Sequence, residues 1–97
     1  MEQLARNLER PEETVVVTAE LHRGRLDIAR RILGSRLIAV ESSQDADTVK
    51  ISVEYVEIGG VRQLLQFGDS IEVTEPDEAR HLMVDLSRAI LSRYEGT

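Results

Sequence analysis

The stretch from residue 64 to residue 94 constrains the fold more than any other part of the sequence. It contains, in order, the end of an amphipathic segment, a corner at Phe67 and Gly68, a short alternating segment that begins at Ile71, and a long amphipathic segment that begins at Pro76. Alternation with a period of two is typical of a half-buried strand, whereas apolar residues three and four apart are typical of a helix. Because proline is well tolerated at the first position of a helix, the stretch predicts helix, strand and helix.

The rest of the chain also predicts a succession of strands and helices. Strands are predicted over residues 14–21, 37–41, 49–55 and 71–74, a polar turn over 42–47, and helices over 25–34, 61–68 and 76–94. The first six elements follow the order strand, helix, strand, strand, helix, strand, which is the split βαβ arrangement of ferredoxin-like domains. The expected fold class is therefore α+β, a ferredoxin-like βαββαβ sandwich with an additional C-terminal helix.

Length and composition limit what such a chain can be. Ninety-seven residues suit one domain, and the absence of cysteine excludes disulfides and thiolate metal sites. The charged N-terminus lacks an apolar run of signal length, and no segment approaches the roughly 18 to 20 apolar residues of a membrane span. We therefore expect a soluble, cytoplasmic domain without a cofactor.

Seven residues of the last third carry a likeness to a known family: Leu64, Leu65, Phe67, Gly68, Glu75, Pro76 and Arg80. A double leucine, a Phe-Gly pair before a strand and a Glu-Pro-x-x-x-Arg helix start occur in this order in the C-terminal extension, or WCX domain, of WYL-domain bacterial transcriptional regulators, which the sequence resembles. Arg62 and Gln63 stand where the family often has an aromatic residue. The resemblance implies a single ferredoxin-like extension domain over residues 14–97 and a tail or interdomain linker over residues 1–13.

In that family the extension follows a helix-turn-helix DNA-binding domain and a WYL domain. It makes dimer contacts and helps the WYL domain to sense a ligand, which for some members is single-stranded DNA. The resemblance thus implies a non-enzymatic regulatory and dimerisation domain, with a second copy, the other two domains and single-stranded nucleic acid as partners. An alternative from another class stays open, namely a stand-alone ferredoxin-like domain that binds a small ligand or another protein.

Catalytic chemistry finds little support in the sequence. The two histidines, His22 and His81, lie far from each other and from any motif, and we interpret both as surface or boundary residues. Acidic pairs fall in a predicted turn and in the first turn of a predicted helix, where acids are favoured for structural reasons. Gly59 and Gly60 lack the further glycines or lysine of a phosphate-binding loop. No catalytic residue and no metal site is predicted.

An arginine cluster is the one charged feature with a functional interpretation. Arg30 and Arg31 project from the polar side of the first predicted helix, and Arg23 and Arg25 fall near its N-terminus, where cations are unfavourable unless an anion is close. We consider these four residues a candidate anion or nucleic-acid site. The competing interpretation is a solvated helix face, and the net charge of −6 argues against nonspecific nucleic-acid binding.

Two surfaces are candidates for self-association. The outer face of the predicted sheet combines Val16 and Thr18 with Ser52 and Glu54, so it is not uniformly polar. The apolar stripe of the last helix is longer than a small sheet needs. We expect a symmetric homodimer through one of these surfaces, and we expect Phe67 to be a core anchor.

Overall fold

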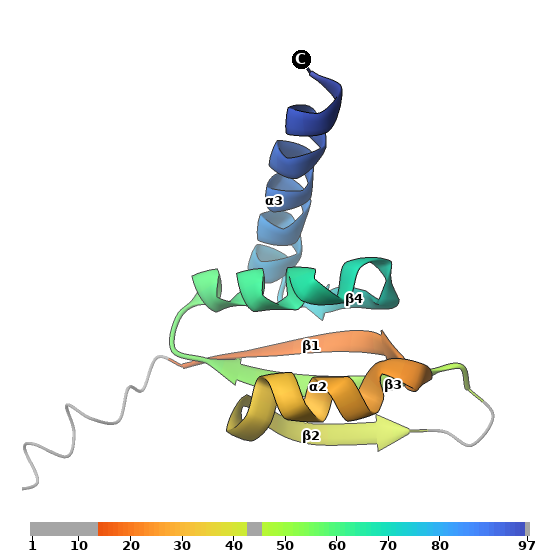
Figure 1. The fold of residues 1–97 in the computed structure, drawn as a ribbon. Helices are drawn as coiled ribbons and strands as arrows, with labels where there is room; N and C mark the ends of the chain where they lie inside the picture. Colours follow the sequence, from red (N-terminus) through yellow and green to blue (C-terminus); the bar gives the residue numbers. More distant parts are fainter. Residues whose placement is uncertain (1–13, 43–45, 97) are drawn as a thin grey trace, which may run out of the picture.

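The computed structural model describes residues 14–42 and 46–96. Four strands, β1 (Val15–His22), β2 (Leu37–Ser42), β3 (Thr48–Tyr55) and β4 (Ile71–Glu75), form one antiparallel sheet in the order β2-β3-β1-β4 (Figure 1). The sheet and its helices make the domain α+β, as expected. The predicted tail or linker over residues 1–13 and the middle of the predicted turn, residues 43–45, lie outside the described residues.

The first predicted helix is present as α2 (Leu26–Leu33), with short 3-10 turns before it, η1 (Arg23–Arg25), and after it, η2 (Gly34–Arg36). Gly34 ends α2 with φ 56° and ψ −130°. A side chain at this positive φ would be strained, so the sequence places glycine where the chain must leave the helix.

The second predicted helix differs from expectation. It is a run of 3-10 turns, η3 (Ile58–Ser70), that continues past Gly68 instead of ending there. Gly68 has φ 57° and ψ −130°, and the chain kinks at this residue and then completes one more turn. The kink is possible because glycine lacks the Cβ that would clash in this conformation.

One apolar core lies between the sheet and the elements that cover it. The strands contribute alternate residues to it, which in β1 are Val17, Ala19 and Leu21, each with no exposed surface. The covering segments add Ala29 and Leu33 from α2, Val61, Leu64 and Phe67 from η3, and Ala79 from the last helix. Phe67 is only 7% exposed, which confirms its predicted place in the core.

A hydrogen-bonded contact fixes η3 against the sheet. The Tyr55 hydroxyl of β3 donates to Oε1 of Gln63 at 2.9 Å, and Nε2 of Gln63 donates to the carbonyl of Ile32 at 3.5 Å. Burial raises the pKa of the Tyr55 phenol to about 12, against an opposing effect from the Arg36 charge. Gly60 lies directly against the Tyr55 ring, where a Cβ would stand 2.7 Å from the ring Cγ. The second glycine of the pair is therefore required by packing.

The last helix, α3 (Asp77–Glu95), starts immediately after Pro76 and projects away from the body of the domain (Figure 1). Its first half packs on the core through buried Ala79 and the half-buried Leu82 and Met83. From Ser87 to Gly96 every residue is exposed. Within the part of the chain that the structure describes, nothing covers the second half of α3.

Candidate protein interface

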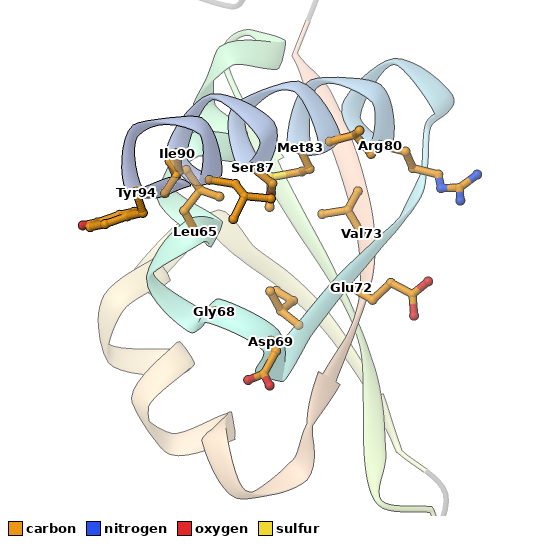
Figure 2. Close-up of a pocket in the computed structure, with 13 residues that line it drawn as sticks. Leu65, Gly68, Asp69, Glu72, Val73, Arg80, Met83, Ser87, Ile90 and Tyr94 are labelled. Carbon is orange, nitrogen blue, oxygen red and sulfur yellow. The ribbon is translucent and has the colours of Figure 1, made fainter. Parts of the chain in front are cut away.

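A groove of about 720 Å³ lies between α3, β4 and the C-terminal end of η3 (Figure 2). Three elements line the groove: η3 with Leu65, Gly68 and Asp69, β4 with Ile71, Glu72 and Val73, and α3 with Arg80, Met83, Val84, Ser87, Ile90, Leu91 and Tyr94. Figure 2 shows the charged ends of Asp69, Glu72 and Arg80 directed away from the centre of the groove. The middle of the groove is therefore apolar and its rim is charged.

The α3 side of this groove is unusually exposed for an apolar surface. Val84 and Ile90 are 46% and 45% exposed, Leu91 is 52% exposed, and Tyr94 is 83% exposed. Single exposed apolar residues are ordinary, but several on one side of one helix, next to an apolar groove, mark an interaction surface. α3 and its groove are thus the strongest candidate interface of the described residues.

The outer face of the sheet is the second predicted surface, and it is more polar. Val16 and Ile38 are 46% and 48% exposed, but Val16 lies opposite Glu54, and a row of charges crosses the sheet further along β1. In that row Glu20 lies between Lys50 of β3 and Glu72 of β4, and Glu41 of β2 pairs with Lys50 on its other side. Thr48 also donates a hydrogen bond to Glu20 at 2.9 Å. Covering this face would require desolvating the charged row, which is costly.

The structure separates the four arginines of the predicted anion site into two pairs. Arg23 and Arg25 belong to η1, at the N-terminal side of α2. The Nε of Arg23 donates to the carbonyl of Ala46 at 3.0 Å, and its backbone N–H donates to the carbonyl of Asp47 at 2.8 Å. These bonds attach η1 to the segment before β3, so a structural role accounts for the position of Arg23.

Arg30 and Arg31 occupy the last turn of α2, where positive charge favours the helix dipole. Both side chains are exposed. The helix therefore needs no anion to tolerate this second pair. A site that uses all four arginines would have to extend along the whole of α2, and it stays a prediction.

The histidines occupy the positions that the sequence indicated. His22 is exposed at the end of β1, and its Nδ1 accepts a hydrogen bond of 3.1 Å from the N–H of Gly24. His81 is exposed on α3.

No group of three or more histidine, aspartate or glutamate side chains among residues 14–42 and 46–96 is arranged to hold a metal ion. In the same residues, no helix has the length and apolar character to cross a membrane.

The sequence indicated only one wall of the groove. The apolar stripe of the last helix is visible in the spacing of its residues, whereas the wall built by Leu65, Ile71 and Val73 depends on how η3 and β4 pack beside α3. The sequence signal that indicates a further contact is the number of apolar residues in α3, which exceeds what one contact with the sheet can bury.

Comparison with known families gives one result. A family model described as the WCX domain matches residues 9–91, which is most of the chain. No curated protein and no solved structure matches it.

Proposed function

We propose that this chain, which belongs to the WCX domain family, acts as a regulatory and dimerisation domain at the C-terminal end of a WYL-type DNA-binding transcriptional regulator. In this proposal the domain performs no catalysis and works in the cytoplasm, beside the WYL and helix-turn-helix domains of the same protein. We also infer that the strand order β2-β3-β1-β4, with α2 and η3 as the covering segments, is a ferredoxin-like arrangement.

The observation that carries the proposal is the exposed half of α3. A helix of 19 residues that buries a single residue completely is not stabilised by its own domain along its full length. Helices in proteins depend on tertiary packing of an apolar face more than on intrinsic propensity. The apolar residues beyond Ser87 therefore favour a role in contact with another protein surface.

Sensing of a nucleic-acid effector is a secondary part of the proposal. It is supported by the exposed pair Arg30 and Arg31 at the end of α2 and by the exposed Arg25 at its start. The net charge of −6 means that such contacts would be local and assisted by the neighbouring WYL domain. The domain would then contribute phosphate contacts, which position a nucleic acid without reading its sequence.

Sedimentation velocity of the chain tests the dimerisation role. Over a series from about 1 to 100 µM, an interface of modest size should produce a concentration-dependent shift from one chain to two. A single-chain species at every concentration would contradict self-association of this domain. A matched measurement on a protein that joins the WYL domain to this chain should give a tighter dimer, because two linked contacts raise the effective concentration of each other.

A further inference from the structure

We propose that the groove beside α3 receives the C-terminal half of α3 from a second copy of this chain, so that two α3 helices pack antiparallel across a two-fold axis near Ser87. This arrangement rests on the proposed dimerisation function and specifies the surface and the orientation that produce it. Each copy contributes a groove and also the helix end that fills the groove of the other copy. Such a reciprocal contact is the usual form of a two-fold interface.

The spacing of the groove residues on α3 supports a helical partner. Residues 80, 83, 84, 87, 90, 91 and 94 follow one another at steps of three, one and three, so they form one continuous stripe. This is the spacing of a seam between two packed helices. The first half of α3 packs on its own core through the adjoining side, with Ala79 and Leu82, and Met83 lies where the two sides meet. α3 therefore has one apolar side for its own domain and, next to it, a second whose C-terminal part its own domain leaves exposed.

The order of side chains along the seam favours the antiparallel orientation. Ser87 lies midway between Arg80 and Tyr94 in the sequence, so a two-fold axis at Ser87 places Arg80 opposite Tyr94 of the second copy. An arginine guanidinium against a tyrosine ring is a favourable pair. A parallel pair would instead place Arg80 against the same arginine of the other copy, and like charges repel.

The formal charges at the two ends of α3 also favour the antiparallel orientation. The first turn carries Asp77 and Glu78, whereas the half after Ser87 carries Arg88 and Arg93 against one acid, Glu95, which is a net charge of +1. Antiparallel packing brings the acidic start of each helix toward this more positive half of the other, and it also opposes the two helix dipoles. Ser87 is small, so the helices can approach closely at the axis.

The shape of the domain permits this contact. α3 projects from the body, so its second half extends beyond the sheet and its covering segments (Figure 1). In an antiparallel pair the two bodies lie at opposite ends of the helix pair and do not compete for space. Ile90 and Tyr94 of the second copy would then lie beside Met83, with Leu65 and Val73 completing the groove (Figure 2).

Cysteine cross-linking tests the position of the axis, and the chain is suited to it because it contains no cysteine. Ser87→Cys places a thiol at the proposed axis. Ser92→Cys is the matched control, since it is an exposed serine on the same helix that does not line the groove. Under mild oxidation at tens of micromolar, Ser87→Cys should form a covalent dimer about tenfold faster or more, because association holds its thiols at a high effective concentration.

A mixture of two variants tests the orientation. Arg80→Cys and Tyr94→Cys, combined in equal amounts and oxidised, should give chiefly the mixed disulfide, which intact-mass spectrometry separates from the two like-with-like products. Arg80→Cys alone and Tyr94→Cys alone should cross-link slowly. Like-with-like products from each variant, without the mixed product, would indicate parallel helices and overturn the arrangement.

The outcomes separate this arrangement from the broader proposal. A dimer in sedimentation whose Ser87→Cys and Ser92→Cys variants cross-link at equal rates would overturn the α3 contact and leave dimerisation through another surface. A chain that stays single at 100 µM, roughly the upper end of the concentration series, would overturn both. In that case the groove would instead be the contact for another domain of the regulator.

Discussion

Replacing Gly60 by alanine should destabilise the domain strongly, although alanine adds only one methyl group. The added Cβ would stand 2.7 Å from Cγ of the Tyr55 ring and closer still to Cδ1, a separation that real Cβ atoms do not show. The ring is only 4% exposed, and its hydroxyl is held by Gln63 at 2.9 Å. Burial and this hydrogen bond therefore both oppose a displacement of the ring.

The size of the effect follows from these two restraints. Forcing an extra methyl group into a packed region costs typically 1 to 3 kcal/mol. Moving the ring would also break the hydrogen bond to Gln63, worth about 0.5 to 1.5 kcal/mol. We expect Gly60→Ala to lower the free energy of unfolding by roughly 2 to 4 kcal/mol, which for a domain of this size lowers the melting temperature by about 10 °C or more.

Gly59→Ala is the matched control in the neighbouring residue. There the nearest atoms to an added Cβ are the Glu57 carboxylate oxygen at 3.7 Å and its carbon at 4.0 Å, which are ordinary contacts. Its stability should stay within about 0.5 kcal/mol of the parent or rise slightly, because alanine restricts the unfolded chain. Urea unfolding followed by circular dichroism measures both variants. Equal stability of the two would refute the packing of Gly60 against Tyr55.

Three further predictions concern single sites. Phe67→Ala should lower the free energy of unfolding by about 3 to 5 kcal/mol because the ring is 7% exposed, and a melting temperature unchanged within about 2 °C would show that the ring lies outside the core. Because burial raises the pKa of Tyr55 from 10.0 to about 12, the folded protein holds this proton more tightly than the unfolded chain, so stability should be complete below pH 10 and fall as pH rises toward 12. Urea unfolding across this range checks the effect, and Tyr55→Phe should lack this contribution to the decline. If Arg30 and Arg31 contact single-stranded DNA, the double variant Arg30→Gln, Arg31→Gln should flatten the slope of log affinity against log salt by about 0.7 for each lost phosphate contact. The measurement uses a protein that contains the WYL domain and this chain. If the affinity and the slope are both unchanged there, the two arginines belong to a solvated helix face.

The sequence predicts the strands well because each has a strong local signal. Val49, Ile51, Val53 and Tyr55 alternate without interruption, and the structure buries all four. The register also follows from this pattern, since a shift by one residue would expose the whole apolar set. The order of elements and the place of Phe67 could therefore be predicted from local rules alone.

Local rules gave less information about η3 and about the groove. The spacing of Val61, Leu64 and Leu65 is compatible with either an α-helix or tighter 3-10 turns, and the structure has 3-10 turns, which the hydrogen bond between Tyr55 and Gln63 joins to β3. The arginines are close in sequence, but α2 separates Arg23 from Arg30 and Arg31. The groove depends on contacts between segments that are distant in the chain, whereas the separation of the arginines follows from the length of α2 itself.

Hydrogen exchange of the α3 amides at several protein concentrations tests most directly whether the second half of this helix is an interface. In a single chain the exposed turns after Ser87 should open easily, because few contacts hold them. We predict that protection of residues 87–95 rises as the concentration increases from about 1 to 100 µM, spanning the expected association, while amides of the buried β1 and β3 stay unchanged. Fast exchange of residues 87–95 at every concentration would contradict the proposal that a second copy covers α3.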